Sequence, residues 1–246
     1  MKIAVLADIH GNLPALEAVL AHAREAGADR FLDLGDVLYG PLWPQETFEV
    51  MRRLEAPTVR GNEDRELVEA ADRGRFRSET VRFSVEAIGP EGIRWLRSLP
   101  SARSDAEGLF LCHGTPSNDK TYLLEDVSRG FARVRPEREI SAALEGVTAP
   151  VVLCGHSHIP NLVAIPGGRI VVNPGSVGLP AYDDDAPVPH VMETFAPHAS
   201  YALLERADDA CRVALHSVPY DHPAAARRAR ENGRPDWAAW LETGRA

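Results

Sequence analysis

Seven aspartate, asparagine and histidine residues, each placed just after a short apolar run, form the clearest chemical pattern in this sequence. They are Asp8, His10, Asp36, Asn62, His113, His156 and His158. Carboxylate, amide and imidazole ligands together suit manganese, iron, zinc or nickel better than magnesium or calcium alone. A carboxylate such as Asp36 can bridge two ions about 3.5–4 Å apart, which then activate a water and hold phosphoryl oxygens. The residue types therefore indicate metal-assisted chemistry.

The spacing inside two of these groups favours a shared site. If the chain stays extended at Asp8-x-His10 and at His156-x-His158, the two side chains of each pair point the same way. Taken singly, the motifs have ordinary explanations, because Gly-Asn is typical of turns and a lone histidine is more often a surface residue. The complete and ordered set is what indicates a metal centre.

The elements that would position these residues are short apolar runs bounded by turn signals, which fit strands buried on both faces. The expected strands span residues 2–7, 30–34, 57–60, 109–112, 150–154, 161–165, 169–172, 201–205 and 211–217. Ligands of an open α/β sheet lie at the carboxyl ends of its strands. We therefore expect the seven side chains to converge at one edge of the sheets.

Helical patterns separate the early strands and predict covering helices. They span residues 12–26, 44–54, 64–71, 79–88 and 90–99, and a helical tail follows from residue 222. Asn12 is a suitable N-cap, Pro14 fits the first turn and Gly27 is a suitable stop. Alternating strands and helices indicate a parallel arrangement, and the strand-rich second half adds a second sheet packed on the first. We predict one domain over 1–246, with a long loop at 179–199 as an insertion.

The composition of the chain limits the expected classes of binding partner and the expected location. The formal net charge of −9 disfavours binding to nucleic acid or to anionic lipid. No apolar run is long enough to span a membrane and no secretory signal is recognisable, so the expected location is the cytoplasm. Three cysteines without a CxxC pair argue against a disulfide framework. The oligomeric state is left open, with a homo-oligomer as one alternative.

The ordered motifs closely resemble those of the calcineurin-like metallophosphoesterase superfamily. The segment Asn173-Pro174-Gly175-Ser176-Val177-Gly178 is similar to the small bacterial and archaeal phosphodiesterase branch. The resemblance spans roughly residues 1–217. It implies an α/β fold, a four-layer α/β/β/α sandwich of two mixed β-sheets flanked by helices.

The resemblance also implies roles for the seven residues. Asp8, His10 and His158 would hold a first metal, and Asn62, His113 and His156 a second. Asp36 would bridge the two ions, and a bridging hydroxide would attack phosphorus in line. Asp36, Asn62 and His113 are the expected catalytic residues. The implied cofactors are two divalent transition-metal ions, with manganese favoured and nickel, iron or zinc as alternatives.

One position departs from the family pattern. Glu63 stands where many members have a histidine that donates a proton to the leaving group. A glutamate near its usual pKa is a poor donor, so esters with acidic leaving groups should react best. His190 is a candidate acid and substrate contact, and Tyr122 and Asn62 are candidate substrate contacts. We expect a small phosphate ester, most plausibly a phosphodiester, as substrate. The alternatives are a phosphomonoesterase or protein phosphatase, and a non-catalytic scaffold such as the retromer subunit of this fold.

Overall fold

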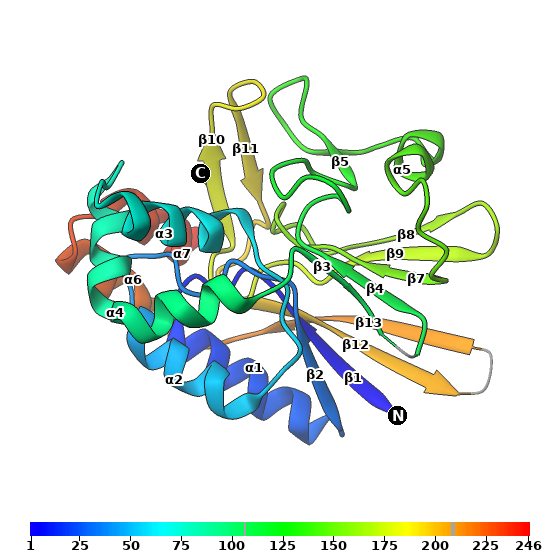
Figure 1. Cartoon of the computed structure of the whole chain (residues 1–246), viewed down its shortest axis with the longest axis horizontal. Helices are drawn as coiled ribbons and strands as arrows, with labels where there is room; N and C mark the ends of the chain where they lie inside the picture. The colour runs from blue at the N-terminus through cyan, green and yellow to red at the C-terminus, as the bar shows by residue number, and fades with distance from the viewer. Residues whose placement is uncertain (106, 208–209) are drawn as a thin grey trace.

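Two β-sheets pack face to face between helices in the computed structural model, which describes residues 1–105, 107–207 and 210–246 (Figure 1). In the first sheet the strand order is β13-β12-β1-β2. Its strands are β1 (Lys2–Leu6), β2 (Arg30–Asp33), β12 (Ala199–Ala207) and β13 (Ala210–Val218). Strand β1 pairs in parallel with β2 and antiparallel with β12, so the sheet is mixed.

The second sheet has the strand order β3-β4-β7-β9-β8. Its strands are β3 (Ala102–Ser104), β4 (Leu109–Cys112), β7 (Val151–Leu153), β8 (Asn161–Ile165) and β9 (Arg169–Asn173). The three central strands β4, β7 and β9 run parallel, and β3 and β8 are antiparallel at the edges. This sheet is therefore mixed as well.

Alternation along the strands explains the layers, because successive side chains face opposite sides of a sheet. On β1, Ile3 and Val5 pack against β4 and β7 of the other sheet, whereas Ala4 and Leu6 face the helices. On the far side of the second sheet, Val152 and Val171 pack against Ile140 of a short helix. The result is the predicted four-layer α/β/β/α sandwich.

The helices are α1 (Leu13–Glu25), α2 (Pro44–Leu54), α3 (Asn62–Arg73), α4 (Glu79–Ser98), α5 (Glu137–Ala143), α6 (His222–Glu231) and α7 (Pro235–Thr243). Asn12 caps α1 as predicted, since its side chain accepts a hydrogen bond from the Ala15 amide at 3.3 Å. Gly89 has a non-helical backbone (φ 56°, ψ −168°) inside α4, which separates the two helices expected at 79–88 and 90–99.

Several segments differ from the sequence prediction, which also contained neither β3 nor α5. Residues 57–60 form no named strand; Thr58 makes only an isolated bridge to Asp33. The segment 179–199, expected to be a loop, contains an antiparallel hairpin of β10 (Ala181–Asp184) and β11 (His190–Glu193). A second small hairpin joins β5 (Glu125–Asp126) and β6 (Arg133–Val134). Within the described residues, no helix is both long and apolar enough to cross a membrane.

Candidate metal centre

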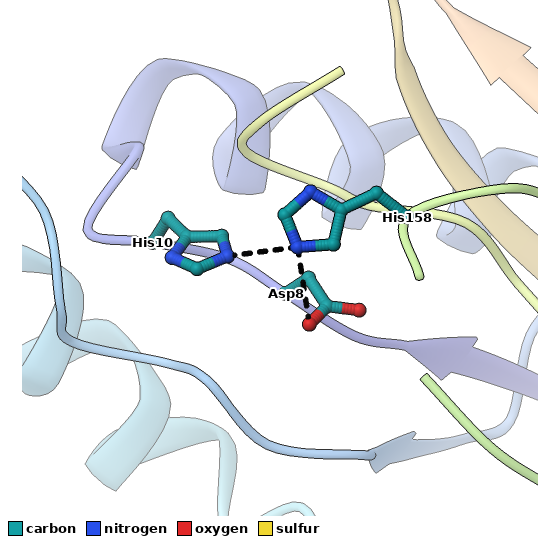
Figure 2. Close-up of side chains that lie close together, drawn as sticks. All are labelled: Asp8, His10 and His158. Carbon is teal, nitrogen blue, oxygen red and sulfur yellow. Dashed lines mark hydrogen bonds and ion pairs between the residues drawn. The ribbon is translucent and has the colours of Figure 1, made fainter. Parts of the chain in front are cut away.

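The tips that follow β1 and β7 bring three predicted ligands together (Figure 2). Asp8, His10 and His158 form a buried group whose ligand atoms lie within 4.8 Å of one another. His10 Nε2 lies 3.1 Å from His158 Nε2. His158 Nε2 in turn lies 3.4 Å from Asp8 Oδ1. Residues 148 positions apart thus meet because the two tips leave facing sheets at the same end.

Backbone carbonyls fix the tautomer of both histidines. His10 Nδ1 lies 3.1 Å from the Tyr39 carbonyl, and His158 Nδ1 lies 2.7 Å from the Leu179 carbonyl. A carbonyl only accepts, so each Nδ1 carries a proton and each ring directs Nε2 toward the other residues of the group. Asp8 Oδ1 is buried and accepts no hydrogen bond from any described residue. Asp8 Oδ1, His10 Nε2 and His158 Nε2 therefore face one another as a set of atoms that a cation could share.

A second group gathers around Asp36, His113 and His156. His113 Nδ1 lies 2.8 Å from the Leu34 carbonyl, which directs Nε2 toward Asp36 Oδ2 at 3.1 Å. Asn62 Oδ1 lies 3.0 Å from the same His113 Nε2. The same end of the Asn62 amide lies 3.0 Å from His156 Nδ1. All four side chains thus direct donor atoms into one small space.

Asp36 connects the two groups. Its ligand atoms also lie within 4.8 Å of those of His10 and Glu63. Glu63 Oε2 lies 3.3 Å from His10 Nδ1, so Glu63 occupies the edge of the centre rather than open solvent. The carboxylate of Asp36 is therefore placed where it can reach ions in either group.

The electrostatics of the centre favour a bound cation. Burial disfavours ionisation of Asp36, yet the charge and hydrogen bond of His113 outweigh it and lower its pKa. Burial likewise disfavours a charged His113, but Asp36 and Asp8 raise its pKa to about 10. Burial lowers the pKa of His10 and of His156 to about 4, so both rings stay neutral and ready to ligate. The carboxylates thus retain a proton on His113 where metal ions can take its place.

The tips are not extended, which corrects one step of the sequence argument. Asp8, His10, His156 and His158 all have positive φ, with values of 54°, 52°, 71° and 60°. The side chains still converge, but they do so through left-handed turns rather than through strand periodicity.

Two glycines allow the backbone to pack this closely. A Cβ on Gly61 would lie 2.1 Å from Asp36 Oδ1, and one on Gly178 would lie 1.8 Å from the Ile9 carbonyl oxygen. Gly178 lies in the segment that resembled the phosphodiesterase branch, and its amide donates to the Asp8 carbonyl at 3.0 Å. These glycines therefore hold neighbouring tips in contact.

Asp64 is a supporting residue that the sequence analysis missed. Its carboxylate accepts hydrogen bonds from the amides of Asp36 at 2.8 Å, Val37 at 3.0 Å and Gly61 at 3.0 Å. It sits three residues after Gly61, the N-cap of α3, and this capping-box spacing was a usable signal. Asp64 joins the tips after β2 and before α3 into one unit.

The candidate substrate contacts lie in different places. Tyr122 lines the cavity above the centre and stacks on His156 with ring centroids 4.6 Å apart. His190 is only 4% exposed and bonds through Nε2 to the Tyr122 hydroxyl at 3.0 Å. It lies behind Tyr122, outside the described residues that line the cavity. The structure thus gives His190 a place from which it supports Tyr122.

The cavity has a volume of about 780 Å³ and opens directly over the ligand groups. Its floor includes His10, Asp36, Asn62, His156 and His158. Residues from α3, the two hairpins and α7 form its walls. A site of this size holds a substrate considerably larger than a phosphate ion.

Comparison with known proteins shows which proteins the whole chain resembles. A family model described as the calcineurin-like phosphoesterase superfamily domain matches residues 1–208. The chain is 26% identical over 257 residues to the uncharacterized protein MJ0912 of Methanocaldococcus jannaschii, covering 96% of this chain and 94% of that protein. The crystal structure of a metallophosphoesterase from Sphaerobacter thermophilus is 27% identical. It superposes with a TM-score of 0.75 over 99% of this chain and 100% of that one.

Proposed function

The chain belongs to the calcineurin-like phosphoesterase superfamily and is a metal-dependent phosphoester hydrolase, and from this premise we propose that it is a dinuclear phosphodiesterase. The observation that carries the proposal is the convergence of imidazole nitrogens and carboxylate oxygens in two adjoining buried groups. His10 Nε2 and His158 Nε2 lie 3.1 Å apart and His158 Nε2 lies 3.4 Å from Asp8 Oδ1, so one cation could contact all three atoms.

In this proposal each group holds one divalent ion. Asp8, His10 and His158 hold the first and Asn62, His113 and His156 hold the second, while Asp36 contributes to both. When bound, such ions supply an activated water and neutralise charge on the phosphoryl oxygens. The chain's own part is to fix the ligand atoms: Tyr39, Leu34 and Leu179 carbonyls orient the imidazoles, and Asp64 secures the tip that carries Asp36.

The charges around the cavity favour a diester over a monoester. Five acidic residues line the cavity outside the proposed ligands: Glu63, Glu66, Asp126, Asp183 and Asp184. Burial raises the pKa of Glu63 well above its usual range, and Asp126 is paired with Arg133. Lys120 also lines the cavity. Three lining arginines are paired with carboxylates, Arg77 with Glu66, Arg135 with Glu139 and Arg234 with Asp236. A phosphodiester carries one negative charge and a monoester close to two near neutral pH. The carboxylates of Asp183 and Asp184 on the β10 side of the cavity therefore repel a monoester more strongly than a diester.

The mixed oxygen and nitrogen ligand set leads us to propose manganese as the preferred metal, with nickel as a substitute. The test is to remove metal with a chelator and to assay bis(p-nitrophenyl) phosphate and p-nitrophenyl phosphate with and without Mn²⁺ or Ni²⁺. Little turnover is expected after chelation, and Mn²⁺ should restore hydrolysis of the diester in preference to the monoester.

His113→Ala should lose diester hydrolysis even with Mn²⁺. A suitable control is His198→Ala, because His198 bonds to Ser217 on β13, away from the centre. Full activity in the chelated protein would refute the metal mechanism. Faster turnover of the monoester would refute the diesterase assignment while leaving the metal centre intact.

A further inference from the structure

Resting on the phosphodiesterase function above, we propose that α7 supplies an aromatic wall that stacks on a planar ring carried by the substrate, with Trp240 as the contacting side chain. The ring is an aryl group on the scissile phosphate or a nucleobase linked to that phosphate through a sugar. Helix α7 lies beyond residue 208, where the family match ends.

The wall starts at the metal centre itself. Trp237 and Trp240 lie three residues apart on α7 and so share one helix face. Trp237 is 2% exposed and meets the His10 ring edge-on, with centroids 5.7 Å apart. Trp240 lies next to it at 6.3 Å and lines the cavity as a partly buried side chain. The aromatic surface therefore extends from a proposed ligand outward along the cavity.

Helix α7 is held firmly enough to act as a wall. Arg234, just before it, donates to Thr80 Oγ1 of α4 at 2.5 Å and lies over the Trp237 ring at 5.4 Å. At the other end, the Phe195 amide donates to the Gly244 carbonyl at 2.9 Å. Both ends of α7 are thus tied to the body of the protein, so an incoming ring meets a surface that is already positioned.

Packing in the hydrophobic core explains why residue 237 is a tryptophan. It does not explain why Trp240 lines the cavity. Trp237 belongs to the main buried cluster, whereas Trp240 keeps part of its ring on the cavity side. The remaining apolar lining near the rim includes Pro187 and Val188 of the hairpin turn between β10 and β11. A diester bound at the metal centre must place one organic group within this cavity. A flat ring should gain more binding free energy there than an alkyl group, because stacking on an aromatic side chain adds to the free energy of burying apolar area.

The test measures binding rather than turnover, so that it stays separate from the test of the proposed function. Calorimetry on the manganese-loaded protein compares three phosphate monoesters that differ only in the organic group: AMP, phenyl phosphate and ethyl phosphate. Both ring-bearing ligands should bind about tenfold more tightly than ethyl phosphate, a factor equivalent to about 1.4 kcal/mol. In Trp240→Ala this preference should fall to about twofold or less.

Trp95→Ala is the matched control, since Trp95 is also a half-buried tryptophan but packs on Phe48 away from the cavity. Its ring preference should equal that of the wild type. A preference for AMP or phenyl phosphate that stays unchanged in Trp240→Ala would overturn the proposal, since the ring would then be recognised elsewhere. Equal binding of all three ligands by the wild type would also overturn it. A protein that binds these ligands as expected but does not hydrolyse diesters would refute only the proposed function.

Discussion

Replacing Glu125 by glutamine should stabilise the protein at alkaline pH and have much less effect at acidic pH. Glu125 lies on β5, and its side chain is 2% exposed. Burial raises its pKa from 4.5 to about 7, although the Ser157 and Asn161 side chains act in the opposite direction. The unfolded carboxyl ionises near 4.5 and the folded one near 7, so the folded state binds the proton more tightly. Stability from this group is therefore fully present below pH 4.5 and is lost as the pH rises through 7.

The magnitude follows from the difference between the two pKa values. From pH 5 to pH 8 the loss amounts to roughly 2.5 kcal/mol, because each pKa unit corresponds to about 1.4 kcal/mol. Glutamine keeps the shape and stays neutral, so the variant should not show this loss. The assay is urea unfolding of chelated wild type and Glu125→Gln at pH 5, 6, 7 and 8. The quantity of interest is the difference in unfolding free energy between the two proteins.

Taking the difference between the two unfolding free energies cancels the contribution of every group that titrates alike in both proteins. Glu145→Gln serves as the control because Glu145 is exposed just beyond α5, and its difference from the wild type should stay flat with pH. A flat difference for Glu125→Gln as well would refute the reasoning. It would mean that the Glu125 carboxylate is solvated or fully paired in the folded protein.

Two substitutions probe the metal centre directly. Asp36→Asn should weaken both metal positions, because Asp36 lies within reach of ligand atoms in both groups; two full ions per chain by elemental analysis would contradict the bridging role. Gly61→Ala would place a Cβ 2.1 Å from Asp36 Oδ1, so it should displace the carboxylate, lower the metal content and destabilise the fold by about 1–3 kcal/mol. Gly74→Ala is its comparison, since a Cβ there meets no described atom within 4 Å although φ is 60°, and it should keep its metal; equal metal content in the two variants would contradict the steric argument.

The layered fold was predictable because it rests on periodicity. Apolar runs such as Leu109–Cys112 and Val151–Leu153 became buried parallel strands, and their neighbouring tips delivered His113 and His156 to one place. The separate helical patterns on either side of Gly89 were also correct, since a glycine with φ 56° interrupts α4. Local sequence signals sufficed to predict an element where burial and backbone preference favour the same structure.

The hairpin at 181–193 was missed for the opposite reason. Prolines and the acidic run around Asp184 have low strand propensity, and pairing with β11 overrides it. The orientation of the ligands was also beyond sequence reasoning, because the Tyr39, Leu34 and Leu179 carbonyls that orient the imidazoles are backbone groups. Any residue type supplies a carbonyl, so no side-chain pattern marks those positions. The contact between Trp237 and His10, which are 227 residues apart in the sequence, was likewise not predictable from any sequence pattern.

Backbone strain is concentrated at the same place as the ligand atoms. Seven non-glycine residues in the described part of the chain have positive φ, and five of them are proposed ligands: Asp8, His10, Asp36, His156 and His158. Each such residue costs about 1–2 kcal/mol in isolation. None can relax alone, because the Asp8 amide donates to the Gly35 carbonyl at 2.9 Å and the His10 amide to the Asp36 carbonyl at 3.0 Å.

Interlocked tips of this kind hold the donor atoms in place before any ion arrives. The His156 amide donates to Asp8 Oδ2 at 3.1 Å, so even the link between the two sheets passes through a proposed ligand. The sandwich core supplies the rigidity that sustains this arrangement, and ion binding then relieves the repulsion among lone pairs that the fold has brought together. Strain, orphaned acceptors and fixed tautomers thus share one cause, a site shaped for cations rather than for its own internal hydrogen bonding.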